Sequence, residues 1–123
     1  MHLEDLVRIL PDDRLIKIAA NKPDIVDWGY ISSLEGKLSE ELIEKNANRV
    51  YWRDISRYQK LSEPFIHKFR DKVDWIEILK HQNVSKEFVK KHAEYIDWDK
   101  ISEQPELSEE FIEDYKDYLD WHI

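Results

Sequence analysis

Residues 61–83 read LSEPFIHKFRDKVDWIEILKHQN, and the same 23-residue frame recurs along most of the chain. Residues 38–60 precede it with a similar pattern, and residues 84–106 and 107–123 follow with two further copies. The tryptophans mark the frame, because successive ones are separated by 24, 23, 23 and 23 residues. They are Trp28, Trp52, Trp75, Trp98 and Trp121. A sequence period of this length indicates a repeat architecture.

Each copy of the frame has the pattern of two short helices. Ser62 suits the N-cap of the first helix, in which Phe65 begins an apolar stripe with helical spacing. Asp74 suits the N-cap of the second helix, which carries Trp75, and Asp74 with Glu77 resembles a capping box. Helices this short are not stable alone in water, so neighbouring copies must stack to bury their apolar faces. The sequence predicts an all-α fold, a short solenoid-like stack of helix pairs with about 23 residues per repeat and the tryptophans in its core.

The chain is expected to form a single repeat domain. Its parts are an irregular N-terminal cap unit at residues 1–37, regular repeats at 38–60, 61–83 and 84–106, and a truncated C-terminal repeat at 107–123. The truncated repeat ends two residues after Trp121, so the second helix of the frame is missing there. Two interpretations stay open: Trp121 folds back onto the preceding repeat, or the apolar edge meets a second copy in a homodimer.

Composition excludes several classes of protein. There is no cysteine, which excludes disulfide bonds and thiolate zinc sites. No 18-residue apolar run is present, and the first residues lack a basic start followed by a long apolar core, so neither a membrane span nor a secretory signal is expected. The two glycines do not form a phosphate-binding loop. A cytoplasmic protein that does not contact membranes is the resulting prediction.

Charge is distributed in three blocks along the sequence. The net charge is −5 over residues 1–44, +6 over residues 45–93 and −9 over residues 94–123, which gives −8 for the whole chain. Such asymmetry affects the choice of partners and the rate of association, and it does not decide the fold.

The histidines and carboxylates do not form a recognisable catalytic or metal-binding pattern. None of the five histidines belongs to an HxxxH pair, and His92 occupies the repeat position of Phe69 and Tyr115, which favours a packing role. A catalytic acid pair needs two carboxyl groups in different environments. The recurring aspartates occupy equivalent helix-cap positions instead: Asp27, Asp74, Asp97 and Asp120. We therefore expect no catalytic residue, no metal and no cofactor.

The frame Leu-Ser-Glu-x-Phe-Ile, followed by Val-Asp-Trp-x-x-Ile-Ser-x-x-Gln, resembles a short tandem repeat of bacteriophage and giant DNA virus proteins. The resemblance covers residues 38–123 well and residues 1–37 loosely. Tyr51 departs from the aspartate of the frame and Leu79 from its serine. That family has no common activity. The resemblance implies a viral or phage origin and a small protein that acts on a host component.

The first functional hypothesis is a non-enzymatic protein–protein interaction module. It would be an inhibitor or adaptor of a host protein, such as a defence protein, and would dock through acidic and aromatic residues near the C-terminus. Their carboxylates could imitate the phosphates of a nucleic acid. We call this set the acidic C-terminal surface, and it comprises Tyr95, Glu109, Glu110, Glu113, Asp114, Asp117, Tyr118 and Asp120.

The alternative hypotheses are a nucleic-acid binder and a purely structural repeat scaffold. Nucleic-acid binding would use basic residues of the middle repeats, which we call the basic waist: Arg49, Arg53, Arg57, Lys60, Lys68, Arg70 and Lys72. The net charge of −8 argues against it, because neutralisation of phosphates drives such binding.

Overall fold

The computed structural model describes residues 10–105 and 107–119, and this part of the chain is helical without any strand. The all-α prediction is thereby confirmed. The α-helices are α2 (Asp12–Asn21), α3 (Trp28–Ser32), α4 (Glu40–Lys45), α5 (Trp52–Tyr58), α6 (Glu63–Lys68), α7 (Trp75–His81), α8 (Lys86–Lys91), α9 (Trp98–Ser102) and α10 (Glu109–Leu119). Two 3-10 helices accompany them, η1 (Pro23–Ile25) and η2 (Ala93–Tyr95).

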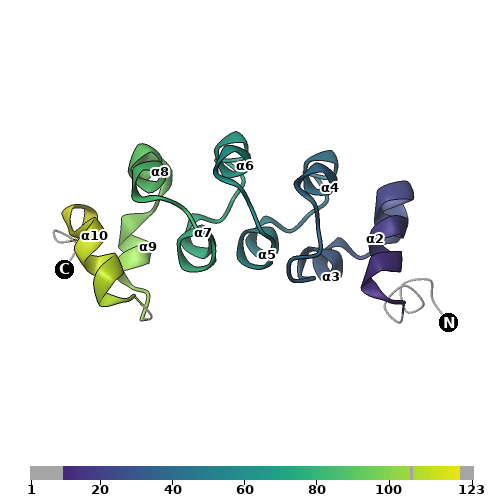
Figure 1. Cartoon of the computed structure of the whole chain (residues 1–123), viewed down its shortest axis with the longest axis horizontal. Coiled ribbons are helices and arrows are strands. Elements are labelled where there is room, and N and C mark those ends of the chain that lie inside the picture. The colour runs from purple at the N-terminus through teal and green to yellow at the C-terminus, as the bar shows by residue number, and fades with distance from the viewer. Residues whose placement is uncertain (1–9, 106, 120–123) are drawn as a thin grey trace. The chain divides into compact units, whose positions relative to one another are not determined.

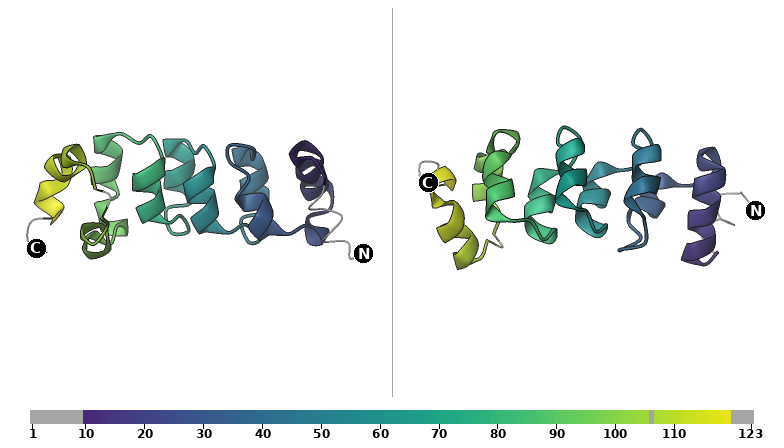
Figure 2. Two further views of the ribbon diagram at one scale, coloured as in Figure 1. Left: turned by 90° about the horizontal axis from the view of Figure 1, so that it is seen from below. Right: turned by 45° about the horizontal axis from the view of Figure 1, so that its top comes forward.

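The helices fall into two compact units, with the division between Gln82 and Asn83. In the first unit, α3, α5 and α7 lie in one row, and α4 and α6 lie in a second row beside it (Figure 1). The contacts agree with this arrangement, since α3 contacts α5 and α5 contacts α7. Two further views show the same alternation of the chain between the rows of this unit (Figure 2). In the second unit, α10 contacts α9.

Side-chain caps start the helices where the sequence predicts them. Ser39, Ser62, Ser85 and Ser108 each accept a hydrogen bond at 3.0–3.3 Å from the backbone N–H three residues later. Asp27, Asp74 and Asp97 cap α3, α7 and α9 in the same way. Such caps satisfy backbone donors that have no partner within the helix, and each contributes about 1 kcal/mol. No side-chain cap is present on α5, which begins after Tyr51.

The first helix of each repeat ends in the same backbone conformation. Asn46, Phe69 and His92 follow α4, α6 and α8 with φ between −119° and −107° and ψ between 15° and 30°. Tyr115 has φ −121° and ψ 18° and interrupts α10. The kink in α10 therefore lies where the earlier repeats end their first helix.

The core consists mainly of recurring aliphatic positions. The residue three positions after each tryptophan is fully buried or 1% exposed in the series Ile31, Ile55, Ile78 and Ile101. A second series, in the first helices, is 0% exposed: Ile43, Ile66 and Val89. Burying such side chains contributes about 1.5–3 kcal/mol each, which is what holds these short helices together.

The tryptophans are not equivalent. Trp28, Trp75 and Trp98 are buried, as predicted. Trp52 was predicted to be buried as well, but it is only half-buried. The Trp52 ring packs against Phe65 and Phe69, with centroids 6.3 and 5.1 Å away, while the rest of its surface reaches solvent. Trp121 lies outside the described residues.

Each described tryptophan also makes the same hydrogen bond. Its Nε1–H donates to the carbonyl five residues earlier, at 2.8–3.2 Å, and the acceptors are Pro23, Ala47, Arg70 and Ala93. The bond ties the second helix of a repeat to the loop before it. A phenylalanine could fill the space but could not make this hydrogen bond, which explains the recurrence of tryptophan at this position.

Two glutamines, the buried Gln59 and the half-buried Gln82, connect successive repeats of the first unit. Gln59 accepts from the Leu38 N–H at 3.0 Å and donates to the carbonyls of Ser32 and Leu34 at 3.0 and 2.8 Å. Gln82 accepts from the Leu61 N–H at 3.1 Å. It also donates to the carbonyls of Ser56 and Gln59 at 2.8 and 2.6 Å. Each glutamine thus satisfies two carbonyl groups of the preceding unit and the N–H that opens its own repeat.

Serine hydroxyls add a second connection. The Ser32 hydroxyl accepts from the N–H of Tyr51 at 3.1 Å, and the Ser56 hydroxyl accepts from the N–H of Asp74 at 3.0 Å. Leu79 occupies the same position of the next repeat and carries no hydroxyl.

Among the described residues, no helix combines the length and apolar character needed to cross a bilayer.

Candidate functional site

The acidic C-terminal surface is centred on α10. Its first turn carries Glu109 and Glu110, and both are exposed, as are Glu113 and Asp117 further along. Ser108 caps the helix through the N–H of Phe111 at 3.0 Å. Glu113 forms an ion pair with Lys116 at 3.1 Å, which is exposed and therefore weak. The helix therefore carries four exposed carboxylates against one exposed cation, Lys116.

Asp114 serves the packing of this unit. Its Oδ1 lies 2.9 Å from Nζ of Lys86 on α8, and its side chain is only 20% exposed. The hydrogen bond and the negative charge of Asp114 raise the pKa of Lys86. Burial, together with the charge of Asp114, raises the pKa of the neighbouring Tyr115 phenol. Asp114 therefore ties α10 to α8, and less of it faces outward than the sequence suggested.

The tyrosines of the predicted surface are half-buried. The ring of Tyr118 stacks on Trp98 with centroids 4.7 Å apart and planes 13° apart, so it covers the tryptophan. Tyr95 lies in η2, with its ring centroid 6.1 Å from that of His92. Asp120 lies outside the described residues.

The α10 helix also carries an exposed apolar side chain that was not among the residues predicted for the acidic C-terminal surface. Ile112 is 43% exposed, whereas the side chains at its repeat position, Ile43, Ile66 and Val89, are fully buried. Glu109 precedes it by three residues, so the two side chains are neighbours on the helix surface. The sequence indicated Ile112 as part of the apolar stripe of the last repeat and did not single it out as a binding residue. The helix thus combines an exposed apolar side chain with exposed carboxylates.

The basic waist is largely engaged within the first unit. Arg49 pairs with Asp24 at 3.0 Å, and Lys68 pairs with Glu44. Arg70 donates to the carbonyl of His67 at 2.9 Å, and Arg57 lies over the ring of Tyr58 at 5.2 Å from its centroid. Lys60 and Lys72 are exposed. The carboxylate partners reduce the positive potential that the sequence block suggested.

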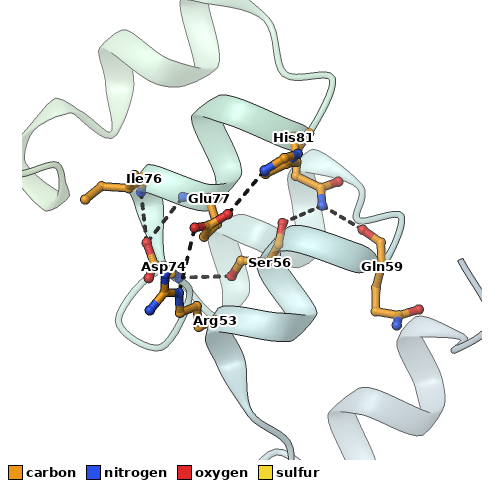
Figure 3. A network of polar contacts seen from close by, with 8 residues as sticks. Arg53, Ser56, Gln59, Asp74, Ile76, Glu77 and His81 are labelled. Atoms are coloured by element: carbon orange, nitrogen blue, oxygen red, sulfur yellow. Dashed lines mark hydrogen bonds and ion pairs between the residues drawn. The ribbon is translucent and has the colours of Figure 1, made fainter. Parts of the chain in front are cut away.

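Arg53 takes part in a polar network with a buried carboxylate (Figure 3). The Glu77 side chain is 5% exposed; its Oε1 lies 3.8 Å from Nε of Arg53 and its Oε2 lies 3.3 Å from Nε2 of His81. Asp74 caps the N–H groups of Ile76 and Glu77. A buried carboxylate is destabilising unless such partners compensate it.

The predicted capping box is therefore only half formed. Asp74 caps the start of α7, but the Glu77 carboxylate turns to Arg53 and His81. The N–H of Asp74, which Glu77 would have bound, donates to Ser56 instead. Arg53 precedes Glu77 by 24 residues, and Ser56 precedes Asp74 by 18. These distant partners replace the local bond because the fold brings them against the start of α7.

Two neighbouring clefts lie in the first unit near η1. One has a volume of about 380 Å³ and lies between the end of α2 and α4. The other has a volume of about 540 Å³ and is lined by Pro23, Asp24, Val26, Asp27, Trp28, Arg49 and Tyr51. Pro23 and Arg49 border both clefts.

The described part of the chain holds no group of three or more histidine, aspartate or glutamate side chains arranged to bind a metal ion. Comparison of the chain with protein-family models, curated proteins and solved structures finds no match. The physical properties of the α10 face and of the clefts are thus the basis for a functional proposal.

Proposed function

We propose that this protein is a non-enzymatic protein-interaction module, a solenoid-like stack of helix pairs that binds a partner protein through the outward face of α10. The observation that carries the proposal is Ile112, which is 43% exposed on a helix that also carries four exposed carboxylates. The fully buried side chains at the same repeat position make this exposure a departure from the frame.

This combination has the physical character of a binding surface. Protein interfaces have an apolar centre, where water is excluded, and a polar rim. Carboxylates at the rim raise the association rate with a basic partner and reject acidic ones. We therefore expect the partner to present an apolar socket bordered by lysine or arginine side chains.

The solenoid part of the proposal is supported by the recurrence of the same bonds from repeat to repeat. The serine caps, the tryptophan N–H bonds and the common helix-ending conformation recur at the spacing of the frame. In the first unit, Gln59 and Gln82 make equivalent bonds to carbonyl groups of the preceding unit, those of Ser32 and Ser56. Stacked repeats of this kind commonly present extended binding surfaces.

The resemblance to phage and viral repeat proteins adds the proposal that the partner is a host protein, which this protein inhibits or recruits. The carboxylates of α10 would then occupy the place of nucleic-acid phosphates on a basic groove. Direct nucleic-acid binding is the less favoured function, because Arg49, Arg53 and Lys68 already face carboxylates.

The test begins with capture of partners from a host lysate by the immobilised full chain, with and without nuclease treatment. The association rate of the identified partner is then measured for the triple variant Glu109→Gln, Glu110→Gln, Glu113→Gln and for Ile112→Ser. We expect the triple variant to slow association about tenfold at low salt, and less at high salt. Ile112→Ser should mainly speed dissociation.

The matched control neutralises three exposed carboxylates of the first unit, in the variant Asp13→Asn, Glu35→Gln, Asp71→Asn. It changes the net charge by the same amount, so it separates a local effect from a general one. Equal slowing by both triple variants, or unchanged kinetics in the α10 variants, contradicts the α10 proposal. Capture that disappears after nuclease treatment favours the basic waist instead.

A further inference from the structure

Two adjacent departures from the repeat frame lie in the first unit, which does not include α10. Tyr51 stands where Asp27, Asp74 and Asp97 cap their helices, and it leaves α5 without a side-chain cap. Gly29 stands in the position after the tryptophan, where the other repeats have larger side chains. A missing cap costs about 1 kcal/mol, so Tyr51 does not serve the stability of α5.

The two departures fit together in space. A Cβ atom on Gly29 would lie 3.3 Å from Cε2 of Tyr51 and 3.2 Å from Oδ1 of Asp27. A larger side chain at Gly29 would therefore push against the ring, and glycine lets the ring lie close to the start of α3. The main chain of Tyr51 is anchored, since its N–H donates to the Ser32 hydroxyl. The residue is nevertheless 58% exposed.

The ring borders the cleft of about 540 Å³ together with two carboxylates. The Asp24 side chain is 84% exposed and accepts from Nη2 of Arg49 at 3.0 Å. Asp27 accepts from the N–H of Tyr30 at 3.2 Å while capping α3. With Arg49 as the one cation among the residues that line it, the cleft has a formal net charge of −1.

We propose that this cleft binds the guanidinium group of an arginine side chain presented by a protein partner. The planar guanidinium would stack on the exposed face of Tyr51 and donate hydrogen bonds to Asp24. Arginine suits the cleft better than lysine, because it is planar, weakly hydrated and able to bind an aromatic face and a carboxylate together. An anionic ligand is disfavoured by both aspartates, and Arg49 is already bound to Asp24 and Asn46.

The site is independent of the α10 face, so each proposal can fail without the other. The test uses the ¹⁵N-labelled full chain and three small probes: N-acetyl-arginine methylamide, N-acetyl-lysine methylamide and N-acetyl-glutamate methylamide. The backbone signal of Gly29 and the indole N–H signal of Trp28 report on the cleft, and the indole signal of Trp75 is the internal control. We expect saturable shifts at Gly29 and Trp28 with the arginine probe, weaker binding of lysine by about threefold and none of glutamate.

Two variants test the contacts separately. Tyr51→Ser removes the ring but supplies a hydroxyl that can cap α5, so the fold is retained, and it should weaken arginine binding about fivefold. Asp24→Asn should weaken it about threefold. Asp71→Asn, which neutralises an exposed carboxylate elsewhere in the unit, should leave binding unchanged. Equal affinity for lysine, shifts that also move Trp75, or full binding by both cleft variants would overturn the proposal.

Discussion

Gln59 and Gln104 both follow the second helix of a repeat, but Gln59 comes seven residues after its tryptophan and Gln104 six, and they bond to different parts of the chain. Gln59 is 2% exposed and binds the Leu38 N–H that opens its own repeat and two carbonyl groups of the preceding unit. Gln104 is half-buried and donates to the carbonyl of Lys100, four residues earlier in its own repeat. The same side chain therefore connects repeats in the first unit and acts locally in the second.

The second unit gains its cohesion in other ways. Tyr118 and Tyr115 pack on Trp98, with centroids 4.7 and 5.8 Å away, and Lys86 pairs with Asp114. Aromatic and charged contacts between side chains replace the buried bonds from side chain to backbone. The glutamine connection is thus found where the glutamine keeps the register of the frame, at Gln59 and Gln82.

The largest effect should come from breaking the glutamine connection. Gln59→Ala leaves three backbone groups near the core without their partner, and we expect it to lower the free energy of unfolding by about 2–4 kcal/mol. The identical change at Gln104 should cost less than about 1 kcal/mol, because a half-buried local bond is replaced by water. Urea unfolding followed by circular dichroism measures both. Equal losses would show that the two glutamines contribute alike, contrary to their bonding.

Local features of this structure were predictable from sequence and long-range ones were not. Ser62 and Asp74 were identifiable as caps because a cap and its helix are adjacent in sequence. The glutamine bonds span 21 to 27 residues and carry no local signal, so only the recurrence of Gln59 and Gln82 hinted at a role. Glu77 shows the reverse case, in which a local pattern predicted a bond that distant partners replace.

The same limit applies to the candidate sites. The acidic residues of α10 were evident from charge, but the Lys86–Asp114 pair and the stacking of Tyr118 on Trp98 depend on packing. Ile112 and Tyr51 are both departures from what the frame does elsewhere, the first in exposure and the second in residue type. Both proposed binding surfaces thus rest on departures from the repeat and not on its recurring positions.

A smaller effect, of opposite sign, should follow from restoring the frame at Tyr51. Tyr51→Asp gives α5 the cap that α3, α7 and α9 have, and it should raise the free energy of unfolding by about 0.5–1 kcal/mol. Tyr51→Ala is the control, because it removes the ring without adding a cap. A gain in stability accompanied by weaker arginine binding is the trade expected of a recognition residue. No difference between the two variants would mean that Tyr51 does not stand at a usable cap position.

The smallest effect concerns the loss of stability of the second unit at alkaline pH. The pKa of Lys86 is raised by its bond to Asp114, and the pKa of Tyr115 is raised by burial, from ordinary values of 10.5 and 10.0. Since the folded state holds both protons more tightly than the unfolded chain, their contribution is complete below about pH 10 and falls as the pH rises through the raised values. The Lys86 side chain is 57% exposed, so solvent screens its charge and keeps the change small. Thermal unfolding between about pH 9 and about pH 12 measures it. The unfolding midpoint of the Tyr115→Phe variant should fall less steeply with pH than that of Tyr58→Phe, the matched change in the first unit. Equal slopes for the two variants would contradict the assignment to Tyr115.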